Sequence, residues 1–101
     1  MFAWLITLAP LLAGEIFGDI RAGEDFLAEV PVQLVCGETK VAGTTDKAGS
    51  FRLKTTGSGR CKLTVTWKTQ SPSVDVVVFE RPTRYRFMIE EHDGKFVLKR
   101  V

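Results

Sequence analysis

The chain has 101 residues, a net charge of +2 at pH 7 and 45% apolar residues. This length supports one domain, and the apolar fraction is typical of a folded globular protein rather than a disordered one. The weak positive charge does not by itself indicate a nucleic-acid-binding protein. The sequence contains no asparagine, so it has no acceptor for N-linked glycosylation.

The first 14 residues, MFAWLITLAPLLAG, carry no charged side chain, and all the charged residues follow them. Their apolar stretch of about twelve residues is too short to span a bilayer as a helix. It is typical of a signal peptide, with the small residues Ala13 and Gly14 offering a cleavage point. We therefore predict a signal peptide over 1–14 and a secreted or periplasmic protein with no transmembrane span. Because no Lys or Arg precedes the apolar stretch, three alternatives stay open: a hydrophobic first strand, a short buried helix and a membrane anchor.

After residue 14, apolar side chains alternate with a period near two, in short segments separated by turn residues. Such segments recur about every ten residues, which is typical of a β-sandwich or barrel. The nearly continuous apolar segment 74–80 predicts a strand covered on both faces, and Asp93-Gly94 predicts a tight hairpin. The predicted strands span residues 15–21, 29–36, 41–45, 50–54, 60–68, 74–80, 84–90 and 95–101.

Both cysteines, Cys36 and Cys61, fall on the apolar faces of their predicted strands. In an exported protein this placement predicts a disulfide between them. In a cytosolic protein the two would remain buried thiols, and that alternative stays open, as does a minor one in which they bind metal or react. A bridge would close a loop of about 25 residues and stabilise the domain by about 3–4 kcal/mol in the chain-entropy model.

Three short motifs follow one another: Gly18-Asp19-Ile20, PVQL at 31–34 and TDKAGSFRL at 45–53. A glycine-containing loop and the alternating strand 59–67 come next. This order resembles the carboxypeptidase regulatory-like domain, a transthyretin-like β-sandwich, from residue 15 to about residue 80. The resemblance implies a seven- to eight-stranded antiparallel Greek-key β-sandwich over 15–101. Cys61 stands where many relatives have a tyrosine.

The motif at 45–53 has a physical explanation that needs no ligand. Asp46 can accept backbone hydrogen bonds within the turn, and Gly49 can adopt positive φ without steric cost. Phe51 and Leu53 then enter the core on one face of the strand. We therefore expect Thr45 and these four residues to determine the fold rather than to bind calcium or another ligand.

The residues needed for known chemistries of this fold are missing. The transthyretin-like superfold includes 5-hydroxyisourate hydrolase, whose family relies on several histidines and a C-terminal YRGS signature; this chain has only His92 and ends in LKRV. One histidine and one tyrosine, Tyr85, do not make an iron site, and no zinc-ligand spacing occurs. We predict a protein that is not an enzyme and has no metal or cofactor. A small hydrolase with an unrecognised site stays open as an alternative.

Basic side chains alternate with the core positions and therefore point outward. They could form a basic face that binds a polyanion, or simply a solvated sheet surface. Nucleic acid is not expected, because the aromatic residues that would stack on bases point inward. The predicted function is a non-catalytic extracytoplasmic module that presents loops or a sheet edge to a protein or carbohydrate partner. The possible basic face comprises Arg52, Lys54, Lys62, Arg84 and Arg86.

Overall fold

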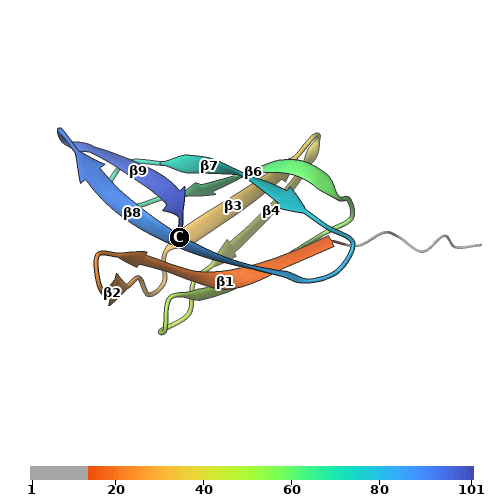
Figure 1. The fold of residues 1–101 in the computed structure, drawn as a ribbon, viewed down its shortest axis with the longest axis horizontal. Coiled ribbons are helices and arrows are strands. Elements are labelled where there is room, and N and C mark those ends of the chain that lie inside the picture. The colour runs from red at the N-terminus through yellow and green to blue at the C-terminus, as the bar shows by residue number, and fades with distance from the viewer. Residues whose placement is uncertain (1–13) are drawn as a thin grey trace, which may run out of the picture.

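Two β-sheets pack face to face in the part of the chain that the computed structural model describes, residues 14–101 (Figure 1). Sheet A holds β1 (Gly14–Ala22), β2 (Asp25–Phe26), β5 (Ser50–Thr55), β8 (Thr83–His92) and β9 (Lys95–Arg100). Sheet B holds β3 (Pro31–Cys36), β4 (Thr39–Thr44), β6 (Gly59–Val65) and β7 (Ser73–Val78). The β-sandwich prediction is confirmed, with the two-residue β2 as an additional strand.

The core lies between the sheets and consists of the side chains that alternation placed inward. Phe87 lies at its centre and stacks on the rings of Phe51 and Tyr85, with centroid distances of 5.8 and 5.6 Å. The Tyr85 hydroxyl crosses to sheet B, where it donates to the Val77 carbonyl and accepts from the Val77 amide, at 2.6 and 3.1 Å. The fully buried side chains are Ile16, Ile20, Leu34, Leu63, Val65, Val76, Val78 and Phe87.

β1 is the central strand of sheet A, with β5 and β2 on one side and β8 on the other. Its pairing with β8 is parallel, whereas the other strand pairs of the described chain are antiparallel. The prediction of an antiparallel sandwich therefore holds except at this pair. Side-chain alternation is the same in both strand directions, so the sequence pattern could not reveal the exception.

The predicted strand bounds agree with the structure to within two residues except at the end of β6, and the predicted covering of β7 is wrong. β6 ends at Val65 rather than at residue 68, because Lys68 and Thr69 adopt positive φ in a turn closed by the Trp67–Gln70 bridge. β7 was expected to be covered on both faces, but it is an edge strand of sheet B and only its inward face is covered. Val77 accordingly remains exposed despite its apolar neighbours.

The motif at 45–53 forms the turn that its residues predict. The Asp46 Oδ1 atom accepts hydrogen bonds from the backbone amides of residues 48 and 50, at 2.8 and 2.9 Å. Gly49 has φ of 77°, and Phe51 and Leu53 are buried. The Thr45 hydroxyl is buried as well; it donates to the Leu27 carbonyl and accepts from the Val30 amide. Thr45 therefore fastens the β2–β3 loop to this turn.

A disulfide joins Cys36 to Cys61, as predicted, with a Cα–Cα distance of 4.4 Å. The register of β3 with β6 pairs Leu34 with Leu63 and Val35 with Lys62, so the next residues along are the two cysteines. The bridge therefore links neighbouring strands of sheet B rather than the two sheets. Cys61 belongs to the core and Cys36 packs against it.

The predicted signal peptide lies outside the described residues, apart from Gly14. This residue is buried as the first residue of β1, where a Cβ atom would come within 2.3 Å of Val78 Cγ1. No helix among the described residues is long and apolar enough to cross a membrane.

Candidate binding face

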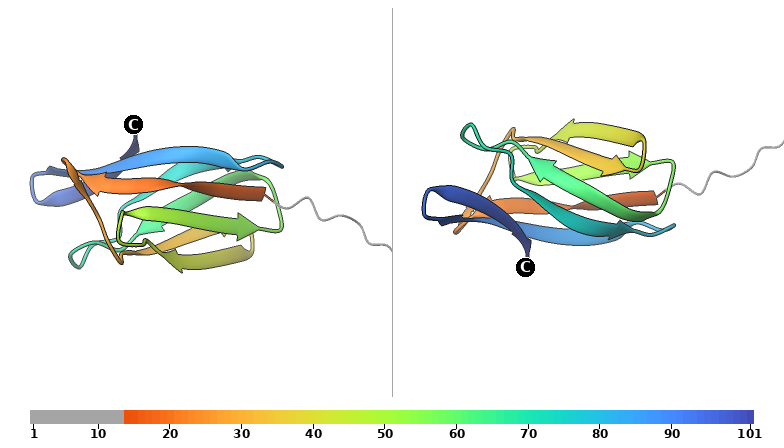
Figure 2. Two further views of the ribbon diagram at one scale, coloured as in Figure 1. Left: turned by 90° about the horizontal axis from the view of Figure 1, so that it is seen from below. Right: turned by 90° about the horizontal axis from the view of Figure 1, so that it is seen from above.

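The outer face of sheet A brings together four of the five basic residues that the sequence pattern singled out. The face is formed by β5, β1 and β8, which lie side by side when the molecule is seen from below (Figure 2, left). Arg52 and Lys54 lie on β5, and Arg84 and Arg86 lie on β8. Lys62 does not belong to this face: it lies on β6, where it pairs with Val35 and Asp75, and points outward from sheet B.

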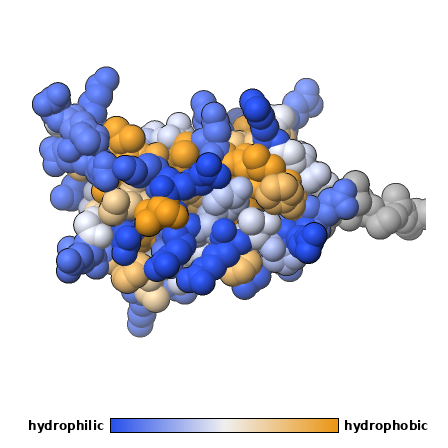
Figure 3. Space-filling view, viewed as in Figure 1, coloured by the Kyte–Doolittle hydropathy of each residue, from blue (hydrophilic) through white to orange (hydrophobic). Residues whose placement is uncertain are grey.

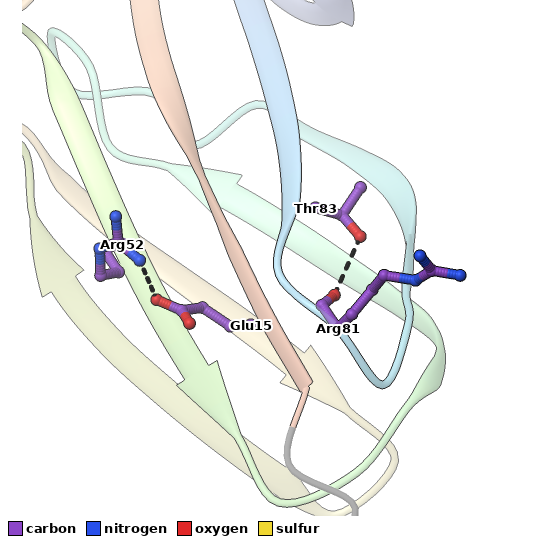
Figure 4. A network of polar contacts seen from close by, with 4 residues as sticks. All are labelled: Glu15, Arg52, Arg81 and Thr83. Carbon is purple, nitrogen blue, oxygen red and sulfur yellow. Dashed lines mark hydrogen bonds and ion pairs between the residues drawn. The ribbon is translucent and has the colours of Figure 1, made fainter.

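Register places Arg52 and Arg84 on either side of Phe17, because Phe17 pairs with both. Two strand spacings separate the two arginines, which is about 10 Å. The Arg52 guanidinium lies 5.0 Å from the centroid of the Phe17 ring and also pairs with Glu15 (Figure 4). Arg52 is therefore held by two contacts, one aromatic and one ionic.

The acidic residues of this face are recessed beneath the basic ones. The side chain of Glu15 is 13% exposed, against 59% for its partner Arg52. Asp19 is 16% exposed, against 49% for Arg86, whose Nε lies 3.8 Å from Asp19 Oδ2. Solvent therefore meets guanidinium groups first. Within the described chain, neither Arg84 nor Lys54 forms an ion pair, although both are exposed.

A hollow of about 550 Å³ opens on this face beside the β4–β5 turn. Cations, carboxylates, the hydroxyl residues Thr44 and Ser50 and aromatic side chains all border it. Such a mixture can receive anionic groups and hydroxyl groups together, because guanidinium groups donate hydrogen bonds and carboxylates accept them. The residues concerned are Phe17, Asp19, Asp46, Ser50, Arg52 and Arg84.

The space-filling view shows the side of the sandwich between β7 and β9 (Figure 3). Hydrophilic residues cover most of this side in both halves, and the larger apolar clusters lie toward its upper half. Among the large apolar side chains, Val77 in β7 and Phe79 just after it are exposed.

His92 lies exposed at the end of β8, outside the hollow. Its Nε2 atom is 3.2 Å from Glu90 Oε1, and Lys99 Nζ is 3.4 Å from Glu90 Oε2. The histidine thus has a carboxylate neighbour but no enclosed site around it. Within residues 14–101 no three side chains of His, Cys, Asp or Glu cluster in a way that could hold a metal ion.

Glu90 provides a pH-dependent prediction. Hydrogen bonds from His92 and then from Lys99 lower the pKa of the Glu90 carboxyl below its ordinary value. A lowered folded-state pKa means that these contacts stabilise the fold above the ordinary pKa of the carboxyl and are lost as pH falls through the lowered one. We expect His92→Ala to raise the pKa of Glu90 toward its ordinary value in an NMR titration. An unchanged pKa in that variant would show that the His92 contact is not formed in solution.

The sequence pattern found the cations but missed the residues that organise them. In the sequence, Glu15 and Phe17 belong only to the predicted strand 15–21, and Asp19 entered only as the middle residue of the Gly18-Asp19-Ile20 motif. Their role depends on having β5 and β8 as neighbours, and the register that sets this is not encoded locally. One signal was available: in β1 charged and aromatic side chains share the outward face, an arrangement that pure solvation does not require.

No protein-family model and no curated protein matches the chain. A similar solved structure is the crystal structure of a 9R-lipoxygenase from Cyanothece PCC8801, with 10% sequence identity and a TM-score of 0.48. The match covers 88% of this chain and 18% of the lipoxygenase chain. This chain therefore spans less than a fifth of that protein, and a likeness at this level implies neither a shared family nor a shared activity.

Proposed function

We propose that this chain is a non-catalytic binding module that acts outside the cytoplasm and uses the outer face of sheet A as its contact surface. The observation that carries the proposal is the layering of charge on this face, with Arg52 and Arg86 outermost and Glu15 and Asp19 beneath them. Placing cations above carboxylates brings no benefit to a surface that contacts only water. On a surface that binds an anionic partner, it puts the attractive charges in contact with that partner.

The fold supports a contact through side chains more than a contact through a strand edge. β1 and β8 are both interior strands of sheet A, so their backbone groups are already paired, whereas β5, the third strand of the face, pairs only with β1. On sheet B, the backbone of Val77 in the edge strand β7 is occupied by the Tyr85 hydroxyl. Strand addition at that point would have to displace the tyrosine.

The proposal includes export and family. An N-terminal signal peptide would deliver the domain to an oxidising compartment, where a disulfide such as Cys36–Cys61 is maintained. We also assign the sandwich to the carboxypeptidase regulatory-like type with Greek-key connections, and the turn built by Asp46 and Gly49 supports this assignment.

A paired set of charge reversals tests the proposed surface. Lys54→Glu with Arg84→Glu changes two exposed cations of sheet A, and Lys40→Glu with Lys62→Glu makes the same net change on the outer face of sheet B. Each protein is immobilised and incubated with proteins and glycans that have been solubilised from the surface of the cells that naturally make it. We expect the unaltered protein and the sheet B variant to retain the same protein or glycan, and the sheet A variant to lose it. Equal retention by both variants would refute the proposed face.

A further inference from the structure

The hollow beside Phe17 points to a particular class of partner. We infer that it binds an acidic polysaccharide, a sugar chain that carries carboxylate or sulfate groups. This inference rests on the proposed function and names its ligand. The anionic groups would lie on Arg84 and Arg52, and the hydroxyl groups of the sugar would lie toward the carboxylates and Ser50.

The two arginines differ in how ready they are to bind. Arg52 is fixed over the Phe17 ring by its contacts with the ring and with Glu15. A side chain that is already ordered loses less entropy when the ligand arrives. Arg84 has no acidic partner within the described chain, so its five N–H donors are open to a carboxylate or sulfate. The hollow therefore holds one ordered cation and one cation without an acidic partner in the described chain, about 10 Å apart.

The carboxylates of the hollow argue against a dense polyanion. Asp19 and Asp46 both line it, and in Asp46 the described hydrogen bonds use only Oδ1, at 2.8 and 2.9 Å. DNA carries one negative charge per about 1.7 Å of helix axis, so its phosphates would meet these acids as well as the arginines. A sugar chain instead has hydroxyl donors between its acidic groups, and carboxylates accept hydrogen bonds from hydroxyl donors.

An acidic protein segment fits this surface less well. Peptides bind sheets mainly by adding a strand to a free edge or by placing apolar anchors in a groove. The hollow spans the interior strands β1 and β8 and the edge strand β5, and its exposed surface is more polar than apolar. Of its two aromatic side chains, Phe51 is buried and Phe17 is half-buried beneath the Arg52 guanidinium. Recognition here must come from polar side chains on an open surface, which suits a hydroxylated chain.

The test uses the full chain with polygalacturonate and chondroitin sulfate as probes, dextran as the neutral sugar, and double-stranded DNA and anionic phospholipid vesicles as other polyanions. We expect binding to one or both acidic polysaccharides at low salt, no binding to dextran, and weaker binding to DNA and vesicles. Arg84→Ala should lower the affinity about tenfold. Arg84→Lys should give an intermediate loss, because it keeps the charge without the planar fork. The matched control is Lys62→Ala, which removes an exposed cation from sheet B and should leave the affinity unchanged.

Three results would overturn the inference. One is DNA or vesicle binding as tight as polysaccharide binding, which would indicate a general polyanion surface. Another is an equal loss in Arg84→Ala and Lys62→Ala, provided that both variants unfold at the same temperature as the unaltered protein. The third is no binding to either acidic polysaccharide at low salt. If the surface-polymer experiment then still retains a protein through sheet A, the proposed function survives and only the ligand class is wrong.

Discussion

Replacing Gly18 with alanine should remove a large share of the stability of this domain. Gly18 lies in β1 between Phe51 of β5 and Tyr85 of β8. A Cβ atom at this position would lie 1.6 Å from the Tyr85 carbonyl oxygen and 2.7 Å from its carbonyl carbon. Both contacts are with backbone, so no rotation of a side chain can relieve them. The parallel pairing of β1 with β8 would have to open.

We expect Gly18→Ala to lower the free energy of unfolding by about 3 kcal/mol or more, at the upper end of what overpacking costs. Domains of this size have about 5–15 kcal/mol in total. Urea unfolding followed by tryptophan fluorescence measures the change. The control is Gly57→Ala, because a Cβ atom there meets nothing within 4 Å and the residue does not have positive φ. A Gly18→Ala protein as stable as Gly57→Ala would mean that β1 and β8 are not paired as described.

The sequence predicted local features of the fold well. The turn at 45–53 depends on the Asp46 carboxylate, on the ability of Gly49 to adopt positive φ and on the alternation of Phe51 and Leu53, all within nine residues. Each is a property of the residue type, so the pattern alone indicates the structure. The inward positions of the other strands follow in the same way from a period of two.

Features that depend on neighbouring strands could not be predicted. Arg52 and Lys62 look equivalent in the sequence, since each alternates with core residues, yet they point outward from different sheets. The apolar run through Val77 suggested a doubly covered strand, but coverage of the outward face depends on whether another layer of the structure packs on it. The proposed binding face also depends on which strands pair, because β5, β1 and β8 come from three distant parts of the chain.

Removing the disulfide should lower the stability about as much as Gly18→Ala does, but through the unfolded chain rather than through steric clash in the folded one. The bridge closes a loop with a sequence separation of 25 residues that contains β4 and β5. In the chain-entropy model such a loop stabilises the fold by about 3–4 kcal/mol, because the bridge restricts the unfolded chain. We expect Cys36→Ala with Cys61→Ala to lower the free energy of unfolding by about this amount, measured by urea denaturation.

A comparison with the reduced protein separates two contributions to the free energy of unfolding, that of the disulfide bond and that of side-chain packing. The unaltered chain, reduced in denaturant and refolded with reductant present, keeps both sulfur atoms in place but lacks the bond. It should lose most of the same free energy, and the double alanine variant should lose somewhat more because Cys61 is a core residue. If the reduced protein were as stable as the oxidised one, the bridge would not stabilise the fold. A large loss would mean that the domain reaches full stability only where thiols are oxidised, which ties its folding to the export that we propose.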